Sequence, residues 1–468
     1  MAAPFVLVVG CASVPPAPER PKTLQVASVV EIVETDSVSI EPVVAAWWGG
    51  FRDETLSALI ETALLQNRDL AVAEANVQTA RAVLARQALQ NSKTTLSTGD
   101  VSVGRPTRQD ADVDITGSGQ IGASWEYDAF GRIAAEIASA EFDVIALQER
   151  RRDVAVIIAA ETALAYSDMT GNQVRLSVAR ANAELQRESL NLLETLFENG
   201  RATQLDLERA RSQFRTTLAL IPQLQANVQT AAVRLSTLTG EPGTAAAILQ
   251  QMTSLDAAQI PSPPDVLSIG TPEALIRRRP DIRAAEADIS SLLALGEAER
   301  ARLFPTLTFN ANVLSLLSED NDLDDSFGFS VGPAIRWDGP DLRRVRANID
   351  ITDAQTRAAF AAYELAVVNA LGEVEAALIA YTNERARQAD LEVAATSAER
   401  AVELARLRFE EGLDDFLDLI DAQRTLLDTQ DRLEISRLTA TRQAIAAYRA
   451  LGGVRLPEPD ALADESET

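Results

Sequence analysis

Arg279-Pro280-Asp281-Ile282 opens an alanine-rich segment with helical spacing, and Asn67-Arg68-Asp69-Leu70 opens a similar segment 212 residues earlier. Other landmarks recur at the same offset: Trp125 with Trp337, and Phe197-Glu198-Asn199-Gly200 with Phe409-Glu410-Glu411-Gly412. Separate matches at one constant offset indicate a tandem duplication. The sequence therefore predicts two copies of one structural unit that cannot close its own surface alone.

Composition excludes several classes of function. The 468 residues carry a net charge of −26, which argues against nucleic-acid binding through a basic face. Histidine is absent, so the commonest general base and the commonest zinc ligand are missing. No glycine-rich phosphate loop occurs either. We therefore expect no enzyme activity, no metal site and no bound cofactor beyond a covalent lipid.

That lipid is expected on Cys11, the single cysteine of the chain. Val8-Val9-Gly10-Cys11-Ala12 follows a short apolar run, and Pro15-Pro16-Ala17-Pro18 comes soon after it. This order resembles a bacterial lipoprotein signal, in which the cysteine becomes the lipidated first residue before a flexible tether. The cysteine is followed by Ala12 and not by the aspartate that marks retention in the inner membrane, so the resemblance implies a location in the outer membrane. The alternative is an ordinary thiol in a disordered start.

Four segments alternate between apolar and polar residues and are expected to be strands: about 94–104, 113–125, 305–316 and 326–337. Their length matches the roughly 9–11 residues that a tilted strand needs to cross a bilayer. Half-buried strands of a soluble sandwich are the alternative. The surrounding sequence reads as helical, however, so these strands have no second sheet to pack against.

Four strands cannot close a barrel, and an open sheet edge cannot lie in lipid. Three chains with four strands each would supply twelve, enough to enclose an aqueous lumen. No run of 18 or more apolar residues occurs, which argues against membrane-spanning helices. The strands therefore predict an oligomeric ring.

Two very long helices are expected at 129–197 and 341–410, because each segment keeps helical spacing over about 70 residues. At 1.5 Å per residue, each helix would be roughly 100 Å long. Two shorter helices in each repeat match that length together: 68–93 with 203–238, and 280–304 with 414–450. The pattern predicts a tall wall of paired helices joined to strands.

Several motifs together resemble the outer-membrane efflux protein family, the TolC-like channels, and especially its NodT/OprM-type lipoprotein branch. They are Trp47-Trp48-Gly49-Gly50-Phe51-Arg52-Asp53, Trp125-Glu126-Tyr127-Asp128-Ala129-Phe130-Gly131-Arg132 and Leu275-Ile276-Arg277-Arg278-Arg279-Pro280-Asp281-Ile282-Arg283-Ala284-Ala285-Glu286. The resemblance implies a mainly α fold with a small membrane β part. It also implies a homotrimer with a twelve-stranded β-barrel in the outer membrane and a twelve-helix tunnel in the periplasm.

The implied layout has six parts. Residues 1–11 are a lipoprotein signal, 12–50 a tether and equatorial segment, and 51–239 the first repeat. Residues 240–272 are an equatorial linker, 273–452 the second repeat, and 453–468 a disordered acidic tail. The implied partners are a periplasmic adaptor, an inner-membrane pump of the resistance-nodulation-division class and outer-membrane lipid.

A duct of this kind must close at its periplasmic end, where the long helices turn. Leu417 and the aspartates Asp418 and Asp421 follow the second turn and share nearly one helix face. By the resemblance they form the constriction, with a ring of carboxylates that favours cations and a leucine ring that excludes water. The alternative is a solvated helix face.

Contacts between the two repeats support the closed state in this family. The resemblance assigns such contacts to Asp206, Phe409 and Asp414, although Phe409 and Asp414 stand where the family often has a tyrosine and an arginine. We therefore expect a gate held more by packing than by polar locks. Asp206 and Arg209 are the first-repeat counterparts of Asp418 and Asp421, so the sequence predicts a wholly acidic face in the second repeat alone.

Two other functions compete with small-molecule export. One is a duct for type I protein secretion, and the other is a soluble periplasmic coiled-coil adaptor. Adaptors carry one helical hairpin beside small β domains, which the 212-residue duplication does not fit. The exported substrate, a drug, a metal or another small molecule, is not readable from the sequence.

Overall fold

The computed structural model describes residues 16–17, 38–39, 46–91, 93–104, 114–253, 259–317, 327–337, 339, 342–411, 413 and 415–453. The chain divides into two compact units. The sheet unit contains Met1–Leu24, Ala75–Glu149 and Arg283–Ala366, and the hairpin unit contains Gln25–Glu74, Arg150–Ile282 and Val367–Thr468. Cys11 and the acidic tail after Gly453 lie outside the described residues.

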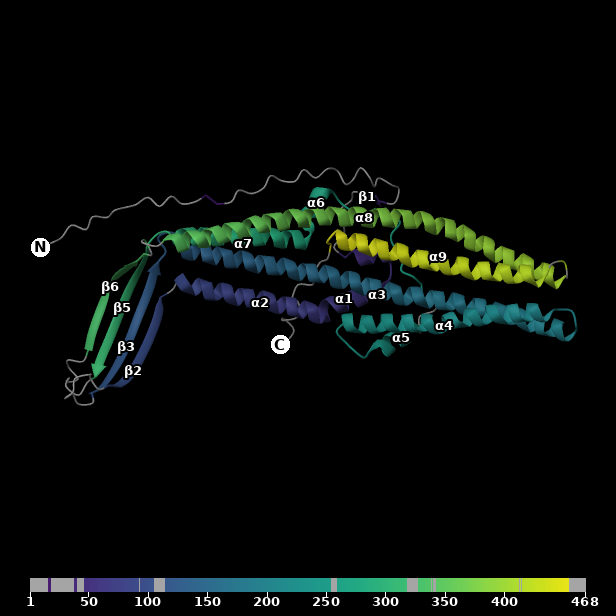
Figure 1. The fold of residues 1–468 in the computed structure, drawn as a ribbon, viewed down its shortest axis with the longest axis horizontal. Helices are drawn as coiled ribbons and strands as arrows, with labels where there is room; N and C mark the ends of the chain where they lie inside the picture. The colour runs from purple at the N-terminus through teal and green to yellow at the C-terminus, as the bar shows by residue number, and fades with distance from the viewer. Residues whose placement is uncertain are drawn as a thin grey trace, which may run out of the picture. The chain divides into compact units, whose positions relative to one another are not determined.

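The sheet unit holds one antiparallel sheet in the order β2-β3-β5-β6 (Figure 1). Its strands are β2 (Thr94–Gly104), β3 (Asp114–Tyr127), β5 (Thr306–Leu317) and β6 (Phe327–Arg336). The expected segments coincide with these strands to within two residues. The largest difference is the end of β3, which continues past Trp125 to Tyr127 because Tyr127 still pairs with Leu307 of β5.

The register gives this sheet one apolar face. Ile121, Val313 and Phe329 lie in one row across three strands, and Phe329 is 85% exposed. On the opposite face the side-chain amide of Gln120 donates to Asn312 Oδ1 at 3.3 Å. Leu96 falls on that polar face, which explains why β2 alternates least clearly in the sequence.

The helical part of the sheet unit comes from the second half of α2 (Arg68–Ala88), the start of α3 (Arg132–Glu198), most of α7 (Pro280–Ala301) and the start of α8 (Leu342–Glu410). A buried cluster of Leu303, Val345 and Ile349 joins the segment after α7 to the first turns of α8. Small side chains join α3 to α7, where the hydroxyl oxygens of Ser139 and Ser291 lie 3.0 Å apart.

The hairpin unit contains the rest of α3 and α8 with α1 (Glu54–Gln66), α4 (Gln204–Leu238), α5 (Ala245–Thr253), α6 (Pro272–Arg278) and α9 (Phe416–Ala450). Its core surrounds the short 3-10 helix at Trp47–Phe51, where Trp47 stacks on Tyr448 at 5.1 Å between ring centroids. The side chains of Leu56, Ile60 and Tyr381 are completely buried. A two-residue parallel pair, β1 (Val38–Ser39) with β4 (Leu267–Ser268), completes the unit.

The sequence predicts long helices at 129–197 and 341–410, and the structure has α3 and α8 at these places. They contain 67 and 69 residues. Both are longer than an ordinary globular helix. In the hairpin unit, α3 is followed by α4 and α8 by α9, and each pair runs side by side (Figure 1). Each repeat thus ends in a hairpin of one long and one shorter helix.

Each repeat closes with a hydrogen bond at a break between its two leading helices. In the first repeat, Asn67 separates α1 from α2, and its side-chain amide donates to the carbonyl of Leu238 at 2.9 Å. In the second repeat, Arg279 separates α6 from α7 and donates to the carbonyl of Ala450 at 2.8 Å. Both donors and both acceptors are equivalent under the 212-residue offset. We call each contact a helix-end joint.

The two joints differ in how the donor is held. Asn67 also caps α2, because its side-chain oxygen accepts from the N–H groups of Asp69 and Leu70 at 2.9 and 3.2 Å. Arg279 is instead held by carboxylates, at 2.8 Å from both Asp281 and Glu373. The same contact is therefore made by an amide in one repeat and by a guanidinium in the other.

Gly240 and Gly452 follow the two joints and are equivalent under the 212-residue offset. Both have a left-handed backbone conformation, with φ of +75° and +69°. A Cβ atom on Gly240 would lie 2.4 Å from the carbonyl oxygen of Gln66.

We expect Gly240→Ala to destabilise the protein by about 3 kcal/mol or more, since backbone strain and a backbone clash combine. Gly243→Ala is the control, because Gly243 has a φ of +96° with open space around it and should lose only about 1–2 kcal/mol. Equal losses in thermal unfolding would contradict a tightly closed joint.

A second prediction concerns Arg279, which is 8% exposed. Arg279→Ala removes the donor to Ala450 and leaves two carboxylates without their partner. We expect a loss of about 2–4 kcal/mol in the free energy of unfolding. The matched control is Arg277→Ala in α6, where the exposed side chain predicts a change within about 0.5 kcal/mol. Chemical denaturation of both variants in detergent measures the difference, and a silent Arg279→Ala would refute the joint.

Candidate functional site

The expected constriction residues lie in the first turns of α9. Phe416 and Leu419 are buried, whereas Leu417, Asp418 and Asp421 are exposed. Leu417 is a large apolar side chain that is 50% exposed. The structure therefore brings the three predicted residues to one exposed face of the helix.

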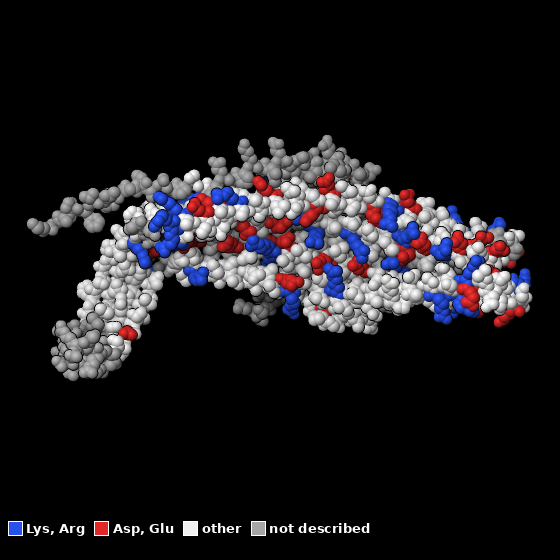
Figure 2. Space-filling view, in the orientation of Figure 1, with Lys and Arg blue, Asp and Glu red and all other residues white. Residues whose placement is uncertain are grey.

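That face is not wholly acidic, and the sequence prediction is wrong in this respect. Arg424 lies one turn after Asp421, and the two side chains form an ion pair at 2.8 Å. Both members are more than 60% exposed, so the pair adds little stability. Acidic and basic side chains alternate over this end of α8 and α9 (Figure 2). Among the residues that the structure describes, Asp418 is the one of the two aspartates that forms no ion pair.

The two repeats begin their second hairpin helix differently. In α4, Thr203 and Asp206 form a capping box: the N–H of Asp206 donates to the Thr203 hydroxyl at 3.2 Å, and the N–H of Thr203 donates to Asp206 Oδ2 at 3.3 Å. Asp415 and Asp418 occupy the equivalent positions in α9, and Asp415 makes no side-chain capping bond. The first repeat thus has a capped start of its second hairpin helix, and the second repeat has an exposed acidic side chain at the equivalent position.

The three residues expected to support the gate have different surroundings. Asp206 is engaged in the capping box of its own helix. Phe409 packs on Phe416 with ring centroids 5.2 Å apart. Asp414 lies outside the described residues. No polar contact between Asp206 and the second repeat is present in the described part of the chain, which leaves packing as the connection through these side chains.

Phe409 contributes to an apolar cluster that includes all four hairpin helices. Its buried members come from both repeats: Leu190, Leu193, Leu207, Ala210, Phe416 and Leu419. The cluster lies beside the two turns and contains mostly leucine and phenylalanine, which have no directional bonds to break. Contacts of this kind allow sliding at lower cost than ion pairs.

Farther along the hairpins, four polar contacts connect α3 to α9. Their α3 members are Asp168, Arg175, Asn182 and Ser189, which lie seven residues apart. Their partners on α9 are, in the same order, Arg442, Asp431, Gln430 and Gln423, at 2.7 to 2.8 Å. We call this set the α3–α9 ladder.

The ladder connects the first repeat to the second, because α3 belongs to one and α9 to the other. Sequence reasoning missed it, although its signal is visible as a polar residue at every seventh position of α3. A seven-residue spacing keeps successive residues on one helix face. The partners on α9 do not keep that spacing, so the pairing itself could not be read from the sequence.

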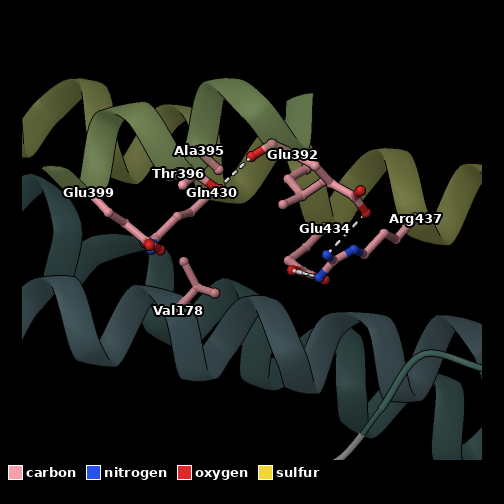
Figure 3. Close-up of a pocket in the computed structure, with 9 residues that line it drawn as sticks. Val178, Glu392, Ala395, Thr396, Glu399, Gln430, Glu434 and Arg437 are labelled. Carbon is pink, nitrogen blue, oxygen red and sulfur yellow. Dashed lines mark hydrogen bonds and ion pairs between the residues drawn. The ribbon is translucent and has the colours of Figure 1, made fainter. Parts of the chain in front are cut away.

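A cavity of about 470 Å³ opens beside the ladder, between α3, α8 and α9 (Figure 3). Its lining residues are Val178, Glu392, Ala395, Thr396, Glu399, Gln430, Leu433, Glu434 and Arg437. Arg437 lies between two carboxylates, at 2.8 Å from Glu434 and 3.3 Å from Glu392. Three glutamates around one arginine give the cavity an acidic character.

Burial raises the pKa of Glu434, although Arg437 opposes the shift. A hydrogen bond from Gln388, helped by Arg437, lowers the pKa of Glu392. The Thr396 hydroxyl at the cavity donates to the backbone carbonyl of Glu392 at 2.9 Å, within its own helix. Among the described residues, no three acidic, cysteine or histidine side chains gather in a way that could hold a metal ion.

Within the described chain, α8 is the one helix that is long and apolar enough to cross a membrane. One such helix is weak evidence, because a core helix passes the same test, and α8 contributes Val374, Leu378 and Tyr381 to the core of the hairpin unit. The sequence analysis argued against membrane-spanning helices from the lack of unbroken apolar runs. By length and composition α8 passes the test for such a helix, so that argument is too strong.

Comparisons with known proteins place these features in a family. The sequence model of the family described as "Outer membrane efflux protein" matches twice, at residues 59–241 and 271–453. The two matches begin 212 residues apart and end 212 residues apart, which is the offset of the duplication.

Individual relatives cover most of the chain. Toluene efflux pump outer membrane protein TtgF of Pseudomonas putida is 30% identical over 440 residues, covering 87% of this chain and 85% of the relative. Nodulation protein T of Rhizobium leguminosarum bv. trifolii is 29% identical and covers 83% and 84%. The structure of the outer-membrane channel OprN is 30% identical, with a TM-score of 0.84 over 94% of this chain and 99% of that one.

The doubled family match, the relatives and the structural neighbour agree with the helical hairpins and the small sheet. The family is one of outer-membrane channels, and its expected location is the outer membrane. The chain belongs to the outer membrane efflux protein family.

Proposed function

We propose that this chain is the outer-membrane duct of a three-part efflux system and that it works as a homotrimer. The observation that carries the proposal is the open sheet β2-β3-β5-β6, whose edge strands are β2 and β6. Backbone groups at a sheet edge must find partners when the sheet lies in lipid. Three copies would join edge to edge into a twelve-stranded barrel.

The apolar face of the sheet supports the same proposal. On β6, Phe327, Phe329 and Val331 are 69 to 85% exposed, and their alternation with glycine and serine is typical of a strand between lipid and an aqueous lumen. In a soluble protein such a face would be covered by a second layer. The hairpin helices of the three copies would continue the barrel as a tunnel through the periplasm.

The duct would export small molecules that a pump in the inner membrane delivers through a periplasmic adaptor. Support comes from relatives whose names describe them as outer membrane proteins of efflux pumps. These names give different cargoes, among them toluene, antibiotics and pyoverdine. We therefore assign no cargo to this chain. Transport needs no catalytic residue, since the pump supplies the energy.

We place the constriction of the duct at Leu417, Asp418 and Asp421. In a trimer each position repeats three times around the axis. Three half-exposed leucines would exclude water, and the carboxylates would favour cations. Arg424 partly neutralises the ring at Asp421, so Asp418 would dominate the charge. The cluster around Phe409 would hold the gate by packing.

The lipid anchor on Cys11 belongs to the same proposal. It rests on the sequence around Cys11 alone, because this residue lies outside the described part of the chain. An acyl chain beside the barrel would add membrane attachment, although the barrel would hold the protein in the membrane without it.

The proposed trimer can be tested by fractionation and by mass. The full-length protein should fractionate with outer membranes, need detergent for extraction and then have a protein mass three times the 50.4 kDa of one chain. Light scattering coupled to size-exclusion chromatography measures that mass independently of bound detergent. A monomer or dimer, or extraction by salt alone, would exclude the barrel and leave the soluble adaptor as the better interpretation.

The constriction makes the second prediction. Leu417→Ala should raise the single-channel conductance in planar bilayers, because the smaller side chains leave the throat wider and wetter. Leu205→Ala is a matched control, since Leu205 is the first-repeat equivalent of Leu417 and is 59% exposed. We expect the control to conduct like the wild type. If both variants conduct equally, the throat lies elsewhere.

A further inference from the structure

Arg300, in the last turn of α7, is the most deeply buried arginine that the structure describes, with 3% of its surface exposed. A buried guanidinium is stable only where its charge is paired and its N–H groups find acceptors. Its nitrogen Nη2 donates to Asp353 Oδ1 of α8 at 2.7 Å and to the backbone carbonyl of Pro16 at 3.2 Å. The second acceptor belongs to neither helix, because Pro16 lies 284 residues away near the start of the chain.

A glycine in α7 leaves room for this guanidinium. A Cβ atom on Gly296 would lie 2.8 Å from Nη1 of Arg300. On the other side of that space, the methyl group of Thr352 on α8 would be 3.8 Å away, and Thr352 is 4% exposed. Glycine inside a helix is less stable than alanine, so this position favours the guanidinium over the helix.

The first repeat has no equivalent of this arrangement. The same three positions, 212 residues earlier, are occupied by Leu84, Ala88 and Glu141. An alanine in place of the arginine offers no side-chain donor, and Glu141 is exposed. The chain has two repeats but one N-terminal segment. A site for that segment is needed once, which is how often the sequence supplies it.

Pro16 and Arg300 are complementary as acceptor and donor. Proline has no backbone N–H, so its carbonyl is the one backbone group that can form a hydrogen bond. The guanidinium of arginine is a donor only. Pro15 and Pro18 stand beside Pro16 in the sequence, and proline-rich segments favour an extended conformation without internal hydrogen bonds. Such a segment offers carbonyls and few donors, which is what a buried arginine can bind.

We propose that Gly296, Arg300 and Asp353 form a docking site for the backbone of the N-terminal tether, which we call the tether latch. Its occupant is the segment of the same chain around Pro16. The latch is a positioning site, since it sets how far Cys11 can move from the folded protein. This last part rests on the proposed function, in which Cys11 carries a lipid.

The latch shortens the reach of the lipid anchor. Five residues lead from Cys11 to Pro16, and a chain of that length spans at most roughly 18 Å. The next described residue that pairs with the folded chain is Val38 of β1, 27 residues after Cys11, which would allow roughly 95 Å. Arg300 stands shortly before β5 begins at Thr306. In the proposed barrel this is the periplasmic border of the sheet, so a short reach would keep the acyl chain in the lipid beside the barrel.

Site-directed spin labelling of the full-length protein in detergent tests the latch. Ala17→Cys places the label directly after Pro16, and a lipidated Cys11 leaves no other thiol to react. We expect a slowly moving label in the otherwise native protein. In Arg300→Met/Asp353→Leu its rotational correlation time should fall roughly tenfold, because the tether would move freely on the nanosecond scale. Both partners are replaced together, since a lone buried carboxylate would destabilise the fold.

A second variant leaves the ion pair in place. Gly296→Leu copies Leu84 of the first repeat and suits a helix better than glycine, so it should fold even if the double variant does not. The larger side chain occupies the space of the guanidinium and should free the label as well. The control is Arg302→Met, because Arg302 pairs with Glu136 and Glu299 instead. There the label should stay slow.

Three results would overturn the latch. They are a freely moving label in the otherwise native protein, a label that stays slow in Gly296→Leu, and a label that the Arg302→Met control frees equally. The number of labels per chain tests the lipid separately. Two labels would show an unmodified Cys11, which would refute the short lipid reach, and Cys11→Ala would then isolate the signal from position 17. Oligomer mass and conductance test the channel independently, so the latch can fail while the proposed duct stands.

Discussion

The helix-end joints are the contacts on which each repeat depends. A carbonyl at the end of a buried helix needs a donor, and Asn67 or Arg279 supplies it from the break between two other helices. The contact fixes where the second hairpin helix ends relative to the helices that lead into the strands. Because both repeats make it at equivalent positions, the duplication gives two hairpins with the same connection in different surroundings.

The differences between the repeats follow from a few substitutions on this common frame. Thr203 and Asp206 close the start of α4 with a capping box, whereas Asp415 makes no side-chain capping bond at the start of α9. The second hairpin helix begins with an exposed acidic side chain beside an exposed leucine, and the proposed constriction is built on this pair. Farther along, the α3–α9 ladder joins the repeats through polar pairs, while the cluster beside the turns joins them through apolar packing. The polar contacts and the apolar contacts between the repeats thus lie at different places along the hairpins.

At the sheet, the controlling constraint is the environment of the backbone. In the proposed barrel, the two open edges of this sheet would pair with the edges of other copies, and its apolar face would lie against lipid. Half-exposed aromatic side chains, Tyr127, Phe130 and Trp337, lie where the strands pass into helices.

By itself the sequence determined the duplication, the long helices and the positions of the strands within two residues, because all of these depend on periodicity and spacing along one chain. The family followed from motifs that resemble those of known members. It also placed Leu417, Asp418 and Asp421 on one exposed face. The pairing of Asp421 with Arg424 and the capping box around Asp206 join residues three apart on one helix, so their spacing was visible in the sequence and the structure showed that both form. The joints at Asn67 and Arg279 and the α3–α9 ladder came from the tertiary structure alone. Only the fold could decide these, since their partners lie 171 residues or more away in the sequence.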